Sequence, residues 1–77
     1  MDREQILREL ESLLNLSSNS LTVETELQNV RAWDSIAVLG VISLADEING
    51  RDLSPWDFKN IHTVNDIIDL ILEDASL

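Results

Sequence analysis

The chain has 77 residues, which is enough for a single domain over residues 1–77 and too few for two. Fifteen acidic residues against five basic ones give a net charge of −10, which disfavours nucleic acid and anionic lipid and favours basic patches on partner proteins. There is no cysteine, which excludes disulfides and thiolate chemistry, and no apolar run approaches the ~20 residues of a spanning helix. We expect a cytoplasmic monomer that does not insert into membranes.

The first predicted element is an amphipathic helix over residues 3–16. Asp2 is a suitable N-cap, and Gln5 three residues later completes a capping-box pattern. The helix has one apolar stripe at three- and four-residue spacing, made by Ile6, Leu7, Leu10, Leu13 and Leu14. The charged side chains, Glu11 among them, are predicted on the opposite, solvent-facing side.

A long connection follows over residues 15–31. Its serine- and asparagine-rich start, residues 17–20, is typical of a turn that ends a helix. Residues 21–27 alternate weakly, but a lone strand would leave its backbone hydrogen-bonding groups unpaired. We therefore expect an ordered loop whose Leu21, Val23 and Leu27 tuck under the helices.

The second helix is predicted to begin at Asp34 and Ser35, which are both good residues for a helix start, and to end at Asn49 before Gly50. Its apolar stripe consists of Val38, Val41, Ile42, Ala45 and Ile48, with Leu39 and Leu44 at its edges. Gly40 lies mid-helix, where glycine costs about 1 kcal/mol relative to alanine. Close approach of another surface would account for it.

Two further start signals complete the chain. Ser54, Pro55 and Asp57 begin a short helix that is predicted to end near Asn60. Thr63 begins the last helix, whose apolar stripe is Val64, Ile67, Ile68, Ile71 and Leu72. The predicted fold is all-α: a small four-helix bundle with one short helix and a long first loop.

The composition argues against an enzyme and against a metal site. His62 is the single histidine, and without cysteine no Cys/His metal cluster can form. His62 precedes the last helix and is expected to be a loop residue. The chain's two glycines make no phosphate-binding loop, and the carboxylates are spread over solvent-facing positions.

The informative segment is Asp34-Ser35-Ile36 at the start of the second helix. On physical grounds alone it is an ordinary helix start. Placed in an acidic helical chain of this length, and followed by Thr63-Val64 and Asp66, it resembles the acyl carrier protein family over essentially the whole chain. The Trp33-Asp34-Ser35 sequence is similar to a subset of carriers outside central fatty-acid synthesis.

The resemblance implies that Ser35 receives a 4′-phosphopantetheine arm, donated by coenzyme A and attached by a phosphopantetheinyl transferase. Asp34 would help that transferase recognise the serine, and the other partners would be acyl-loading and acyl-processing enzymes. A helix N-terminus is also a physically suitable place for a phosphodiester. The implied partner-contact residues are Ile36, Ala37, Gly40, Ser43, Asp46 and Glu47.

Some residues differ from the family pattern, and these differences indicate the kind of pathway in which the chain acts. Ala37, Gly40 and Ser43 stand near the serine where fatty-acid carriers are acidic, so we expect a specialised rather than a housekeeping pathway. Asn49 replaces an aromatic residue that is common before the glycine. Trp33 is expected to brace the serine turn.

The sequence leaves two alternatives and one question open. The chain could be an aminoacyl or D-alanyl type carrier, or an unmodified acidic protein-interaction module of the same fold. Trp56 and Phe58 are expected in the core or lining a cleft rather than contacting cargo. The residues that could line a cleft for cargo, rather than simply form the core, are Val38, Ile42, Phe58, Ile61 and Ile67.

Overall fold

The computed structural model describes residues 2–73, and the regular elements within this range are all helical. The α-helices are α1 (Arg3–Leu13), α2 (Ser35–Asn49) and α3 (Val64–Leu72), joined by two 3₁₀ turns, η1 (Leu27–Asn29) and η2 (Pro55–Phe58). The all-α class is confirmed. The expected fourth helix is the single turn η2, and η1 was not predicted.

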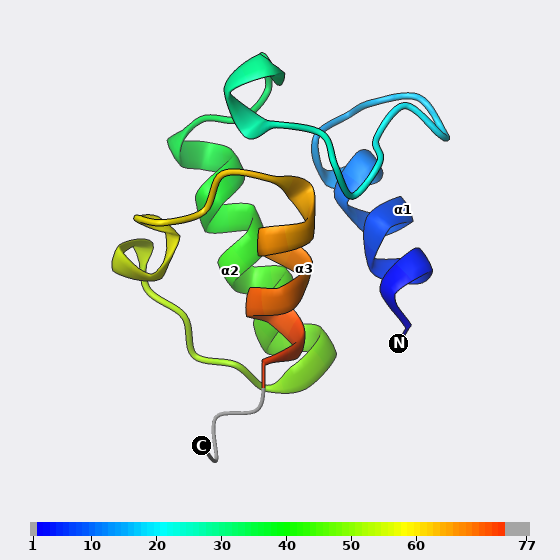
Figure 1. The fold of residues 1–77 in the computed structure, drawn as a ribbon. Helices are drawn as coiled ribbons and strands as arrows, with labels where there is room; N and C mark the ends of the chain where they lie inside the picture. The colour runs from blue at the N-terminus through cyan, green and yellow to red at the C-terminus, as the bar shows by residue number, and fades with distance from the viewer. Residues whose placement is uncertain (1, 74–77) are drawn as a thin grey trace.

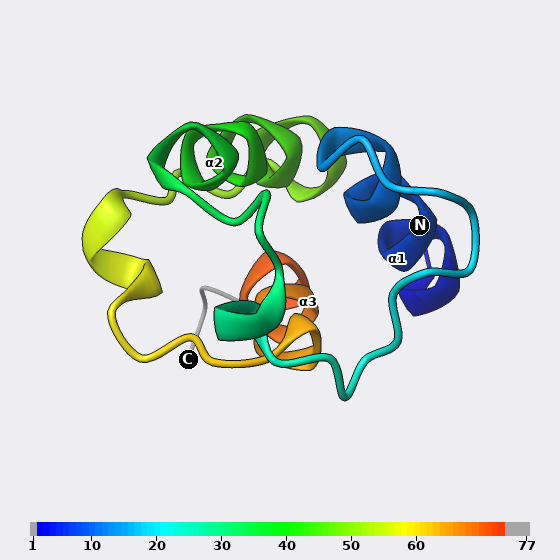
Figure 2. The same ribbon diagram turned by 90° about the horizontal axis from the view of Figure 1, so that it is seen from above.

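The three α-helices surround one apolar interior (Figures 1 and 2), and η2 lies beside α2 on the side away from α1. Every α-helix contributes buried side chains, as does the long loop, so they share one core. Its members are Ile6, Leu7, Leu10, Leu14, Leu21, Leu27, Ala37, Val41, Ala45, Leu53, Val64, Ile67, Ile68 and Ile71. The prediction that Leu21 and Leu27 tuck under the helices is confirmed, and Val23 is half-buried.

Helix starts follow the predicted capping residues. Asp2 and Gln5 form a capping box at α1, and Thr63 and Asp66 form one at α3. Each box satisfies backbone N–H groups that the helix itself leaves unpaired. Helix α1 ends at Leu13, three residues earlier than predicted.

The long loop is tied to the start of α3 by backbone hydrogen bonds. The N–H of Leu27 donates to the carbonyl of His62 at 2.9 Å, and the N–H of Val64 donates to the carbonyl of Thr25 at 3.0 Å. The N–H of Asn65 donates to the carbonyl of Val23 at 2.9 Å. These bonds give the loop the partners that a lone strand would lack and fix the path that leads to α2.

The packing of α1 against α2 explains why position 40 is a glycine. A Cβ atom built at this position would lie 3.2 Å from both terminal carbons of Leu13, which is tighter than ordinary contact. Glycine therefore lets α1 approach α2 closely at its C-terminal end. Helix α1 is thus the surface whose close approach accounts for the glycine at position 40.

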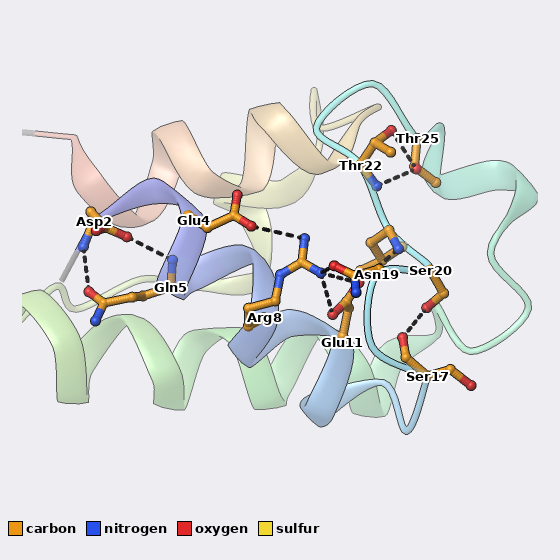
Figure 3. A network of polar contacts seen from close by, with 11 residues as sticks. Asp2, Glu4, Gln5, Arg8, Glu11, Ser17, Asn19, Ser20, Thr22 and Thr25 are labelled. Carbon is orange, nitrogen blue, oxygen red and sulfur yellow. Dashed lines mark hydrogen bonds and ion pairs between the residues drawn. The ribbon is translucent and has the colours of Figure 1, made fainter.

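Glu11 corrects the predicted solvent face of α1. Its side chain is only 3% exposed, and its Oε2 accepts the N–H of Leu21 at 2.9 Å. Nη1 of Arg8 lies 3.1 Å from Oε1 of Glu11 and donates a hydrogen bond to Oδ1 of Asn19 at 2.6 Å (Figure 3). The loop folds over this carboxylate and buries it, an effect that helical periodicity cannot reveal.

Candidate functional site

Ser35 is the first residue of α2 and is exposed. Asp34 is the N-cap, and its Oδ1 accepts the N–H of Ala37 at 2.9 Å. Within residues 2–73 the Ser35 hydroxyl makes no hydrogen bond, and no histidine or lysine pairs with it as a base. The site therefore offers a free hydroxyl at a helix N-terminus, where the unpaired N–H groups favour an anion.

The turn before Ser35 is held by Trp33. Its N–H donates to the carbonyl of Val30 at 3.0 Å, and its half-buried ring packs against Phe58 of η2. The two ring centroids are 6.2 Å apart at an interplanar angle of 43°, a tilted geometry that aromatic pairs favour. Trp33 thus fastens the serine turn to η2, as expected.

The face of α2 around Ser35 is more apolar than the sequence analysis assumed. Ile36 is 76% exposed and Leu39 is 59% exposed, although Leu39 was predicted at the edge of the core stripe. On η2, Trp56 is 80% exposed, so its predicted place in the core or a cleft is wrong. Large apolar side chains in water on a small monomer are typical of a surface that meets other molecules.

Two of the expected partner-contact residues do not lie on the exposed face. Ala37 is 5% exposed because it shares the buried stripe of Val41 and Ala45, four and eight residues later. Gly40 is half-buried against Leu13. The other four, Ile36, Ser43, Asp46 and Glu47, are exposed, and Ile36 is the one of these nearest the serine in sequence.

A groove of about 300 Å³ lies between the start of α2 and η2, and we call it the Ser35 groove. Its lining is Ser35, Val38, Leu39, Pro55, Phe58 and Lys59. Three of these, Leu39, Pro55 and Lys59, were not predicted as site residues from the sequence. Helical spacing places Leu39 one turn from Ser35, but only the tertiary position of η2 brings Lys59 there.

The residues proposed for a cargo cleft do not share one cavity. Val38 and Phe58 line the Ser35 groove, while Ile61 lines a separate pocket of about 430 Å³ beside Trp33. Ile67 is completely buried in the core. Ile67 is therefore a core residue and does not line a cleft.

The remaining titratable groups near the loop serve structure. The carboxylate of Asp66 accepts the N–H of His62 at 3.0 Å and that of Thr63 at 3.1 Å, which lowers the pKa of Asp66. His62 is exposed, as a loop residue should be. Among residues 2–73, no group of three or more acidic or histidine side chains could hold a metal ion.

Asn49, which departs from the family pattern, makes a contact that the sequence analysis did not foresee. Its side-chain N–H donates to the carbonyl of Ile71 at 3.1 Å. This carbonyl belongs to the last turn of α3, where backbone acceptors lack helical partners. Asn49 therefore ties the end of α2 to the end of α3 in place of an aromatic contact.

Comparison with known proteins finds a similar acyl carrier protein. The chain is 28% identical over 75 residues to an acyl carrier protein of Coprothermobacter proteolyticus, and the alignment covers 92% of each protein. No protein-family model matches the chain, and no solved structure gives a significant match. The chain is therefore similar to an acyl carrier protein over nearly its whole length.

Acyl carrier proteins are carriers rather than enzymes, and the family bears a covalently attached 4′-phosphopantetheine group. The described residues of this chain suit such a group. The Ser35 hydroxyl is exposed and free of hydrogen bonds to other described residues, and the neighbouring groove offers apolar walls and one ammonium. Within the described range, no helix is long and apolar enough to cross a membrane.

Proposed function

We propose that this chain holds acyl or related intermediates as thioesters on a 4′-phosphopantetheine arm attached to Ser35, and presents them to partner enzymes. The observation that carries the proposal is the exposed Ser35 hydroxyl at the first position of α2, directly after the capping Asp34. The arm supplies the thiol that the cysteine-free chain lacks. The protein supplies an attachment point, a fixed orientation and a docking face.

Ser35 acts as an acceptor that a transferase activates, because no described side chain is hydrogen-bonded to its hydroxyl. The helix N-terminus stabilises the phosphodiester once it is formed. Asp34 is exposed and uses Oδ1 for the cap, which leaves Oδ2 available to the phosphopantetheinyl transferase. We therefore assign transferase recognition to Asp34.

The surface of α2 supports a specialised pathway. Its first turn has no acidic residue, and its exposed acids, Asp46 and Glu47, lie near the opposite end of the helix. Weak charge beside the arm reduces electrostatic steering onto basic patches, so apolar contacts through Ile36 and Leu39 gain weight. The partner enzymes should present an apolar surface near the serine and basic groups further along α2. We expect them in the cytoplasm, with this chain as a monomer.

The test is transfer of the arm from coenzyme A by a broad-specificity phosphopantetheinyl transferase, followed by intact mass measurement. We expect the mass of one phosphopantetheinyl group on the wild-type chain and none on Ser35→Ala. Ser43→Ala is the matched control, because Ser43 is also an exposed serine of α2. A chain that gains no mass, or a gain that survives in Ser35→Ala, would contradict the proposal.

A further inference from the structure

The Ser35 groove combines three chemical features within about 300 Å³. The first is the Ser35 hydroxyl at the start of α2. The second is a set of apolar walls from two elements, Val38 and Leu39 on α2 and Pro55 and Phe58 on η2. The third is the ammonium-bearing side chain of Lys59, which is the cap residue that follows η2.

Lys59 stands apart from most of the chain's basic residues. Arg3, Arg8 and Arg51 each form an ion pair with a carboxylate. Lys59 forms none within residues 2–73, although the chain has fifteen acidic residues against five basic ones. Arg31 is likewise exposed and without an ion pair in that range, but it does not line the groove. A cation available for pairing therefore lies beside the hydroxyl that we propose as the attachment point.

The chemistry of a phosphopantetheine arm matches the composition of this groove. Its phosphodiester is the part bound directly to the serine oxygen, so the negative charge must lie at the Ser35 end of the groove. Beyond the phosphate come a methylene group, a carbon that bears two methyl groups, a hydroxyl-bearing carbon and then two amides. A groove that has both an ammonium and apolar walls suits an anion joined to an apolar branch.

We propose that Lys59 pairs with the phosphodiester of the arm on Ser35 and holds the dimethyl segment of the arm against Leu39 and Phe58 in the Ser35 groove. This inference rests on the proposed function. Because Lys59 is exposed, the pair is weak and screened by salt, so the arm exchanges between a docked and a free state. The docked state directs the arm along η2 and away from α1, and a partner enzyme releases it by competing for the same apolar walls.

The experiment uses the holo protein prepared by the transferase reaction and confirmed by intact mass. Nuclear Overhauser contacts between the arm's methyl groups and the side chains of Phe58 and Leu39 are expected in the wild type. Lys59→Gln should lose these contacts, and Lys59→Arg, which keeps the charge, should retain them. Arg31→Gln removes an equal charge from outside the groove and should also retain them. Raising NaCl to about 0.5 M should weaken the contacts in the wild type, because screening lengths then fall to a few Å.

Failure of this inference is separate from failure of the proposed function. A holo wild type whose mass includes the arm, but whose methyl groups show no contact with Phe58 or Leu39, overturns the docking of the arm. Contacts that persist unchanged in Lys59→Gln overturn the role of Lys59. A wild-type chain that gains no mass overturns the proposed function itself, and this inference with it.

Discussion

The two sides of the bundle treat their polar and apolar groups in opposite ways. On the α1 side, Glu11, Arg8 and the loop N–H of Leu21 are joined in one network, and the loop closes over it (Figure 3). On the Ser35 side, next to η2, the serine hydroxyl and the Lys59 ammonium have no partner within residues 2–73, and Ile36 and Leu39 are in water. We call the first the closed side and the second the open side.

This difference bears on the stability of so small a domain. A chain of this size buries only about 60% of the surface that its unfolded form exposes, so its core has little stability to spare. On the closed side, the carboxylate of Glu11 anchors the long loop. On the open side, Ile36 and Leu39 remain exposed and add no comparable burial.

The largest effect expected at a position of α2 comes from Gly40, where α2 meets the closed side. Gly40→Phe should destabilise the fold by about 1–3 kcal/mol, because the new side chain must displace Leu13 of α1. The measurement is urea unfolding followed by circular dichroism. Leu13→Ala in the same chain should restore part of the loss by making room.

Ser43→Phe is the matched control, since Ser43 is on the same helix and exposed. It should change the free energy of unfolding by no more than about 0.5 kcal/mol. Equal destabilisation by both aromatic substitutions would contradict the packing account of Gly40.

The features that the sequence predicted correctly depend on short-range chemistry. The caps at Asp2, Asp34 and Thr63 involve neighbours three residues away, so local spacing reveals them. The burial of Glu11 and the glycine at position 40 depend on segments that meet only in the folded chain. Helical periodicity does not reveal contacts between distant segments. The sequence therefore predicted helix α1 itself but not the contacts that its side chains make with the loop and with α2.

The second prediction concerns the pH dependence that Glu11 gives to stability. The hydrogen bond from the Leu21 N–H, aided by Arg8, lowers the pKa of Glu11 in the folded state below its usual value of 4.5. The unfolded chain therefore binds the proton more tightly, so this stabilisation is complete above about pH 4.5 and is lost as the pH falls through the folded-state pKa. Glu11→Gln removes it, and the difference in unfolding free energy between wild type and variant should shrink as the pH falls below about 4.5.

Urea unfolding at a series of pH values between 7 and about 3 measures this difference. Glu9→Gln is the control, because Glu9 is exposed on the same helix and makes no ion pair within residues 2–73. Its stability should follow that of the wild type throughout. A Glu11→Gln variant whose difference from wild type is independent of pH would show that the carboxylate charge does not anchor the loop.

At the site too, features set by neighbouring residues were predicted, and features set by the tertiary fold were not. Ser35 and Asp34 were identified from a resemblance carried by consecutive residues, and the structure places them as a helix start. Ala37 was misplaced on the exposed face, although its spacing of four from Val41 marks it as a core residue. Lys59 was not assigned and Trp56 was wrongly expected in the core or a cleft, because their surroundings depend on how η2 sits beside α2.

The smallest expected effect sharpens the comparison most directly, because it concerns what the open side does not contribute to stability. Leu39→Ala should change the free energy of unfolding by no more than about 0.5 kcal/mol, since the side chain is 59% exposed. The same substitution on the closed side, Leu10→Ala, removes a completely buried side chain and should cost about 2–5 kcal/mol. Urea unfolding of both variants gives the two values. Leu39→Ala should nevertheless weaken binding to a partner enzyme, because a leucine that contributes so little to the fold is available for contact. A loss of stability at Leu39 comparable to that at Leu10 would mean that the open side is packed as tightly as the closed side.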